Sequence, residues 1–334
     1  MTAPAAKTPK TRKTRKMVDV FSDVERETAL AANPSGYAVT ALAAANPRIL
    51  TLTADLSNTL AEFRERFPER YIELGIAETN SVSLAAGLAT CGFVPYIFSM
   101  APFGVLKCAE QLRTDVDYNH LPVRLVGRLS GLAMGYFGTS HYAVEDIAIA
   151  RTLNNTTVVA AADALSAVAL LGVTADSAGP VYIRIAEQVP SVYDTEPAYS
   201  PGTWLKLRAG GDLTLIGHGL GVSLAAGAAE RLAAGHGIEC DVFDAAYLKP
   251  FDSGALTESA RRTGKVLTIE DHSVVGGLGS IVAETLAAHE IRARTSQAAL
   301  PAKDLEVGVP ADLYEYYGLT VEGVTAKALD LTRR

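Results

Sequence analysis

The residues best suited to chemistry in this sequence lie in the segment 71–80, YIELGIAETN. The pattern predicts a short strand over residues 71–74, a glycine turn, and Glu78 at the start of an apolar helix. A carboxyl group placed among Ala, Val, Leu and Gly loses much of its hydration, which favours its neutral form. Such a glutamate is suited to acid/base work near neutral pH. A glutamate that only favours the positive end of a helix dipole would explain the same pattern.

Short apolar strands alternate with helical patterns through the first half of the chain. The predicted strands cover residues 49–53, 71–74, 94–98, 123–127, 157–160 and 181–185. The predicted helices cover residues 36–45, 79–90, 105–118, 145–153 and 163–177. This alternation is typical of a mostly parallel sheet with helices on both faces.

A second alternating unit follows a segment rich in proline and polar residues, which predicts a linker at 191–202. Its predicted strands are 212–217, 239–244 and 265–270, and its helices are 220–234, 253–263 and 278–289. Glycines at 217, 219, 276, 277 and 279 fall at strand-to-helix turns, which cradle phosphate in some proteins but are routine in doubly wound sheets. The sequence therefore predicts an α/β protein of two doubly wound, mostly parallel-sheet domains, at 18–190 and 203–334.

Composition narrows the class of protein. A chain of 334 residues with 49% hydrophobic and 20% charged residues is typical of a soluble two-domain protein. Net charge is −7, yet residues 1–16 hold six basic residues and no acid, so residues 1–17 are predicted to form a disordered tail rather than a nucleic-acid-binding arm. The uncharged run 81–106 is cut by glycine and proline, which favours a buried α/β core over a membrane span.

Cysteine and histidine spacing excludes two further kinds of site. The three cysteines show no paired spacing, so we expect them to be reduced and buried, as in a cytoplasmic protein. The six histidines form no metal-ligand pattern, and we expect no metal site within this chain.

Four stretches carry a resemblance to a known family. Residues 73–103, ELGIAETNSVSLAAGLATCGFVPYIFSMAPF, resemble the pyrimidine-binding domain of transketolases and 1-deoxyxylulose-5-phosphate synthases. Residues 53–57 (TADLS) resemble the family's Ala-Asp-Leu turn, and residues 138–141 (GTSH) its substrate-histidine loop. Residues 269–280 (IEDHSVVGGLGS) resemble the start of its C-terminal domain. The resemblance covers nearly the whole chain, in the family's order.

The resemblance implies a thiamine diphosphate cofactor, whose thiazolium carbon becomes a carbanion. Glu78 would bond the nitrogen of the aminopyrimidine ring and relay its proton. Phe103 falls where the family stacks a phenylalanine on that ring, and Met100 where a second aromatic is common, although ordinary core packing is the alternative for both. Asp55 and Leu56 would lie beside the cofactor, unless Asp55 is only a helix cap.

The resemblance also implies substrate contacts. His141 aligns with a histidine that contacts substrate, where a neutral imidazole helps proton transfer. Arg184 matches an arginine that grips the substrate phosphate, and its alternative is a surface salt bridge with Glu187.

Departures from the family pattern fall at the substrate end. Phe137 stands where the family has a carboxylate that receives a sugar hydroxyl, and Leu129 stands where it has a histidine. A phosphate-binding arginine expected near residues 33–35 is absent from that stretch. These changes predict a less hydroxylated or unphosphorylated substrate, as in specialised metabolism.

The chain lacks the Gly-Asp-Gly turn with which the family holds Mg²⁺ and the diphosphate, since residues 210–212 (GGD) open a strand in the other domain. We therefore expect a separate N-terminal subunit to supply those contacts, in an α₂β₂ assembly. The leading hypothesis is the C-terminal subunit of a split transketolase. The alternatives are the β subunit of a 2-oxoacid dehydrogenase or related acyl-forming enzyme, and a non-catalytic regulatory paralogue.

Overall fold

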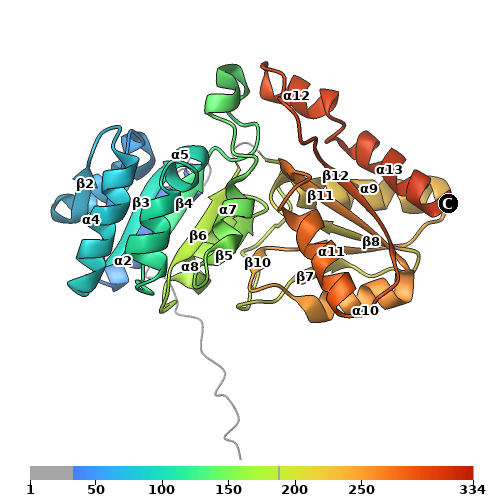
Figure 1. Cartoon of the computed structure of the whole chain (residues 1–334), viewed down its shortest axis with the longest axis horizontal. Helices are drawn as coiled ribbons and strands as arrows, with labels where there is room; N and C mark the ends of the chain where they lie inside the picture. The colour runs from blue at the N-terminus through green and yellow to red at the C-terminus, as the bar shows by residue number, and fades with distance from the viewer. Residues whose placement is uncertain (1–32, 187–188, 334) are drawn as a thin grey trace, which may run out of the picture.

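The computed structural model describes residues 33–186 and 189–333, which form two α/β units side by side along the long axis of the molecule (Figure 1). The first unit holds a sheet of strand order β10-β5-β6-β4-β3-β1-β2, and the second a sheet of order β12-β11-β8-β9-β7. All pairings are parallel except β10 with β5 and β7 with β9. The predicted fold class is confirmed. The predicted tail, 1–17, lies outside the described residues.

The first sheet is buried on both faces because its strands are continuously apolar. Leu50, Ile97 and Val158 point to one face, toward α4 and α7, whereas Ile49, Phe98 and Val159 point to the other, toward α2 and α8. The strands are β1 (Ile49–Thr53), β2 (Tyr71–Glu73), β3 (Val94–Met100), β4 (Arg124–Arg128), β5 (Thr157–Ala161) and β6 (Val181–Ile185). The main helices are α2 (Pro34–Ala45), α3 (Ala61–Arg66), α4 (Glu78–Thr90), α7 (Asp146–Thr152) and α8 (Ala164–Thr174).

The second unit repeats this layout on a smaller scale. Helices α9 and α13 pack against β8 and β11, while α10 and α11 lie on the opposite side of the sheet (Figure 1). Its strands are β7 (Leu205–Arg208), β8 (Leu213–Gly217), β9 (Cys240–Asp244), β11 (Lys265–Ser273) and β12 (Arg294–Leu300). Its helices are α9 (Leu220–His236), α10 (Ser253–Thr263), α11 (Leu278–Ala288), α12 (Pro310–Tyr316) and α13 (Val321–Arg333).

The predicted linker, 191–202, is packed against both units. The backbone N–H groups of Val192 and Tyr193 donate to Asp163 Oδ2 at 2.8 and 2.9 Å. Beyond the linker, β10 (Tyr247–Lys249) leaves the second unit and pairs antiparallel with β5. The C-terminal segment therefore completes the N-terminal sheet, which the sequence pattern did not predict.

The helix predicted over residues 105–118 is wrong. The segment is broken into α5 (Ala101–Val105), α6 (Ala109–Gln111) and a π-helical stretch, η3 (Leu112–Asp117). Proline at the second position starts α5 early, and a π-helical turn shifts the helical register. Such turns are frequent at functional sites, and this one follows a segment that carries two residues of the candidate site described below.

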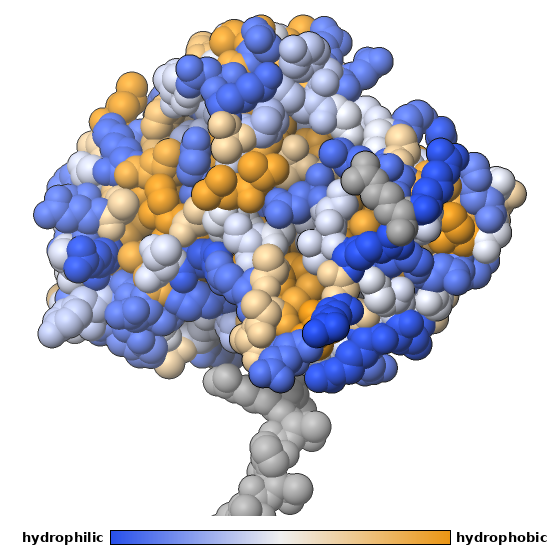
Figure 2. Space-filling view, turned by 45° about the vertical axis from the view of Figure 1, so that its right-hand side comes forward, coloured by the Kyte–Doolittle hydropathy of each residue, from blue (hydrophilic) through white to orange (hydrophobic). Residues whose placement is uncertain are grey.

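Two expectations drawn from composition meet different outcomes. The uncharged run 81–106 forms parts of α4, β3 and α5, and in the described part of the chain no helix is long and apolar enough to cross a membrane. All three cysteines are free, but only Cys108 and Cys240 are buried; the expectation of burial is wrong for Cys91, which is exposed at the C-terminal end of α4. The molecular surface mixes hydrophilic residues with apolar patches, some of them at the upper edge where η4 (Gly135–Ser140) and α12 project (Figure 2).

Candidate functional site

Most of the predicted site residues lie just beyond the carboxyl ends of four neighbouring strands, β2, β1, β3 and β4. Parallel strands end at the same edge of their sheet, and ligands of open α/β sheets bind in the crevice at that edge. Asp55 and Leu56 follow β1, Glu78 follows β2, and Phe103 follows β3. The long loop after β4 carries Phe137 and His141.

Glu78 is the first residue of α4 and only 4% exposed. Its Oε2 accepts a hydrogen bond from Lys107 Nζ at 2.7 Å, and the lysine side chain is 48% exposed. Oε1 makes no hydrogen bond with any described residue. The carboxyl group thus offers one partnered oxygen and one oxygen open to a ligand. The hydrogen bond to Glu78 raises the pKa of Lys107, which keeps the lysine charged.

Sequence reasoning missed Lys107, although a signal was present. It is the first charged residue after the uncharged run 81–106. The bend after α5 carries it next to Glu78, 29 residues away in sequence. The same short segment holds Phe103, whose carbonyl accepts from the Cys108 thiol at 3.2 Å. The short segment 103–107 therefore supplies both an aromatic ring and the hydrogen-bond partner of the buried glutamate.

Three aromatic rings meet beside this segment. The His141 ring lies edge-on to Phe103, with ring centroids 5.1 Å apart, and stacks on Phe137 at 4.6 Å. Ser140 Oγ lies 2.8 Å from His141 Nδ1 and orients the imidazole. The Phe137 side chain is 59% exposed, and Met100 is partly buried at the end of β3. The structure therefore unites Phe103, Phe137 and His141 in one apolar wall.

Asp55 has a backbone φ of +60°, a left-handed conformation that few residues other than glycine adopt. Its N–H points to Glu73 Oε1, 3.4 Å away, and its side chain is exposed. The short 3₁₀ helix that follows, η1 (Ser57–Leu60), has Leu56 at its N-cap and no side-chain cap. The alternative that Asp55 caps a helix is therefore wrong. Backbone strain of this kind clusters at ligand sites.

Arg184 lies apart from these residues, in the interior between the two units. It is 1% exposed, and its guanidinium donates to Asp146 Oδ2 at 2.9 Å and to Asp271 Oδ1 at 2.7 Å. A further donor reaches the Ala143 carbonyl at 3.1 Å. An incoming phosphate could bind this guanidinium only by breaking both ion pairs. The geometry therefore disfavours the predicted phosphate contact, and Glu187, its other predicted partner, lies outside the described residues.

The segment 269–280 joins the two units rather than lining the site. Glu270 accepts from the backbone N–H groups of Leu278 and Gly279 at 2.7 and 2.8 Å and so caps α11. Asp271 is the partner of Arg184. Burial opposes its ionisation, but the adjacent guanidinium outweighs burial and holds the pKa of Asp271 below its usual range. This motif therefore has an evident structural role.

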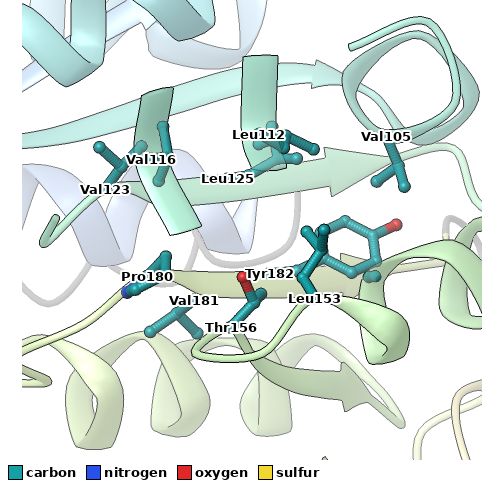
Figure 3. A pocket seen from close by; sticks show the side chains of 11 residues that line it. Val105, Leu112, Val116, Val123, Leu125, Leu153, Thr156, Pro180, Val181 and Tyr182 are labelled. Atoms are coloured by element: carbon teal, nitrogen blue, oxygen red, sulfur yellow. The ribbon is translucent and has the colours of Figure 1, made fainter. Parts of the chain in front are cut away.

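An apolar pocket lies elsewhere, between η3 and the face of the sheet formed by the neighbouring strands β4 and β6 (Figure 3). Val116, Leu125 and Tyr182 are among its lining residues, and none of the predicted site residues takes part. The Tyr182 hydroxyl is bonded to Asp146 and is not free for a ligand. We take this pocket as a packing defect of the core. In the described ranges, no group of three or more His, Cys, Asp or Glu side chains is placed to hold a metal ion.

Two family models match the sequence: transketolase, pyrimidine binding domain, over residues 31–190, and transketolase, C-terminal domain, over residues 202–324. The chain is 33% identical over 297 residues to an apulose-4-phosphate transketolase subunit of Phocaeicola vulgatus, covering 88% of this chain and 94% of that protein. It is 35% identical over 292 residues to a 6-deoxy-6-sulfo-D-fructose transketolase subunit of Clostridium sp., covering 86% and 89%.

Among solved structures, a split-gene transketolase in the form of an inactive beta4 tetramer is similar over most of the chain. It matches with a TM-score of 0.83 and 38% sequence identity, covering 90% of this chain and 97% of that chain. The likeness therefore extends through both α/β units and across the linker.

Proposed function

The chain belongs to the transketolase family, and from that membership we propose that it is the C-terminal subunit of a two-component transketolase that depends on thiamine diphosphate. Its reaction moves a two-carbon ketol unit from a ketose donor to an aldehyde acceptor. The observation that carries the proposal is Glu78, which is nearly buried yet has one carboxyl oxygen without a partner among the described residues.

The residues on this edge of the sheet fit the aminopyrimidine half of the coenzyme. Glu78 Oε1 is an open hydrogen-bonding group for a ring nitrogen, and Phe103 supplies an aromatic surface nearby. When bound, the coenzyme supplies the nucleophilic carbon and the electron sink for carbon–carbon bond cleavage. The part of Glu78 is to hold or release a proton at Oε1, with water excluded by burial.

The His141 loop is the substrate side of the proposed site. His141 Nε2 has no partner within the described residues, so this nitrogen is free to bond a hydroxyl or carbonyl oxygen of the substrate. The stacked Phe137 ring fixes the imidazole plane and presents an apolar face. Met100, Asp55 and Leu56 complete the proposed set around the coenzyme.

A second subunit is part of the proposal. It supplies a Gly-Asp-Gly turn that holds Mg²⁺ and the diphosphate, because this sequence contains no such turn. The structurally similar split-gene chain forms an inactive beta4 tetramer on its own. We infer that this chain is likewise inactive alone, and that an α₂β₂ assembly in the cytoplasm is the working enzyme.

The proposed substrate is not an ordinary pentose phosphate. The two relatives act on apulose 4-phosphate and on 6-deoxy-6-sulfo-D-fructose, so substrates vary among similar subunits. In this chain Phe137 offers no hydrogen-bond acceptor, and Arg184 is already engaged by two carboxylates. Both observations favour a substrate with fewer hydroxyl groups near His141 and without a phosphate at Arg184.

The test is Glu78→Gln in the complex reconstituted with its partner subunit. Glutamine keeps the shape but not the titratable oxygen, so turnover with a ketose donor and glycolaldehyde should fall by at least about a hundredfold. Ser83→Ala, at an exposed position of the same helix, is the matched control. Activity of Glu78→Gln within a factor of two of wild type would remove the proton relay.

A parallel assay separates the alternative of a 2-oxoacid dehydrogenase. The wild-type complex is given a ketose donor with aldehyde in one arm, and a 2-oxoacid with an oxidant in the other. Turnover confined to the second arm would replace the ketol transfer proposed here with acyl formation.

A further inference from the structure

The loop between β4 and α7 carries both Phe137 and His141. Hydrogen bonds hold its two ends together at a position that we call the neck of the loop. Gly131 and Ala143 exchange backbone hydrogen bonds of 3.1 and 3.0 Å. The loop begins with Leu129 at a φ of +56°, a conformation that a leucine rarely adopts. A strained first residue and hydrogen-bonded ends are typical of a loop whose conformation is imposed by the residues packed around it.

Several residues that contact this loop belong to the C-terminal unit. The Tyr142 hydroxyl donates to the carbonyl of Glu306, and the Gly308 N–H donates to the Gly135 carbonyl at 3.2 Å. A Cβ on Gly135 would lie 2.5 Å from the Gly308 carbonyl oxygen. Only glycine therefore lets the segment 306–308 approach the loop this closely.

Tyr314 of α12 reaches the neck itself. Its hydroxyl accepts from the Leu132 N–H at 3.1 Å. A Cβ on Gly131 would lie 2.9 Å from that hydroxyl and 2.1 Å from Asp271 Oδ2, so both oxygens meet at the neck. Burial and the Asp271 carboxylate raise the pKa of Tyr314, so its hydroxyl stays protonated and neutral beside that carboxylate. Asp271 in turn holds Arg184.

From these contacts we propose that Tyr314 and Tyr142 are positioning residues, through which the C-terminal unit fixes the Phe137–His141 wall relative to Phe103. The inference rests on the proposed function in one respect, namely that this wall meets the substrate. The C-terminal unit thereby determines substrate fit without contacting substrate. The hydrogen-bond partners of the two hydroxyls, Leu132, Gly135 and Glu306, are not among the residues proposed to hold the coenzyme, so we expect coenzyme binding to be unaffected by loss of either hydroxyl.

The first experiment uses the full chain alone and does not depend on the proposed function. Tyr314→Phe removes one hydroxyl, and Tyr316→Phe removes the hydroxyl of a 65% exposed neighbour on the same helix. Amide hydrogen exchange within residues 129–145 should become about tenfold faster in Tyr314→Phe and stay unchanged in Tyr316→Phe. Equal exchange in the two variants would overturn the anchoring.

The second experiment measures kinetics in the reconstituted complex, with hydroxypyruvate as donor and glycolaldehyde as acceptor. Tyr314→Phe and Tyr142→Phe should each raise KM for glycolaldehyde about tenfold and leave kcat within about threefold, since the wall is displaced but the coenzyme is not. Affinity for thiamine diphosphate, measured by fluorescence titration, should stay within about twofold.

The outcomes separate this inference from the proposed function. An unchanged KM, or a loss of coenzyme affinity in parallel with activity, overturns the positioning role while leaving ketol transfer in place. A wild-type complex without ketol transfer refutes the proposed function, and hydrogen exchange then still decides whether the C-terminal unit anchors the loop.

Discussion

Glu78 and Arg184 are both nearly buried charged residues of the N-terminal unit, but their surroundings differ. Among the residues that the structure describes, Glu78 has one hydrogen-bond partner, the half-exposed Lys107, and one open oxygen. Arg184 is engaged by Asp146, by Asp271 and by backbone carbonyls on both sides of the domain boundary. A buried charge with an open position is available to a ligand, whereas a buried charge with every direction filled is committed to the structure.

The difference also bears on how each residue contributes to stability. Two carboxylates around one guanidinium compensate its desolvation, and removal of one member leaves an uncompensated charge inside the protein. The Glu78–Lys107 pair reaches solvent on the lysine side, so water replaces a lost partner more readily. We therefore expect substitutions at Arg184 to act mainly on folding, and those at Glu78 and Lys107 mainly on activity.

The largest effect is expected for Arg184→Met, which leaves Asp146 and Asp271 buried and unpaired. The free energy of unfolding of the isolated chain should fall by about 3–5 kcal/mol, measured by urea denaturation. Arg208→Met, which breaks the surface pair with Glu239, is the matched control and should cost about 1 kcal/mol or less. Equal losses in the two variants would contradict the contrast drawn here.

A third buried charge, Asp244, sharpens the comparison because its partners are neutral. Tyr193 and Tyr199 donate to its Oδ2 at 2.7 and 2.5 Å. Burial nevertheless raises the pKa of Asp244 from 3.8 to about 6. The folded state therefore binds more protons than the unfolded state between these two values, and stability from this group is lost as the pH rises through about 6.

The measurement is the free energy of unfolding at pH 4 and at pH 7 for wild type and Asp244→Asn. About 3 kcal/mol of the wild-type loss between these pH values should disappear in the variant, as expected for a shift of about two pKa units. Asp194→Asn, at an exposed position in the same region, controls for the removal of one negative charge. A pH dependence that persists in Asp244→Asn would show that the tyrosines compensate the burial.

Much of the fold follows from local sequence patterns, whereas the partners of these buried charged residues do not. The bounds of β1, β6 and α10 were predicted to the residue, because apolar runs and turn residues mark them. The short strand β10 was not predicted, because its three residues pair with a strand that is distant in the sequence. The broken helix after α5 was also missed, because hydrophobic periodicity does not distinguish a π-helical turn from an α-helical one.

The residues of the candidate site also divide into those that local motifs identify and those whose role depends on contacts distant in sequence. Glu78, Phe103 and His141 follow from motifs whose residues lie close together in sequence, and the structure brings the two rings together. The state of Arg184 depends on carboxylates 38 and 87 residues away. A motif identifies the residue type, but only the tertiary structure shows whether its donors are already engaged.

The smallest effect is expected for Lys107→Met, which removes the hydrogen-bond partner of Glu78 Oε2. Lys107 Nζ donates to Oε2 and holds the carboxyl group in one orientation, so its loss should let the group rotate and misplace Oε1. Ketol transfer by the reconstituted complex should fall about tenfold, and Lys107→Arg should restore it to within about twofold, because arginine keeps the charge and the donors. The stability of the isolated chain should change by only about 1 kcal/mol, since the lysine is half exposed. If Lys107→Met lowered stability as much as Arg184→Met and arginine failed to rescue activity, Lys107 would be a structural partner like the two aspartates, and Glu78 would belong with Arg184 rather than opposite it.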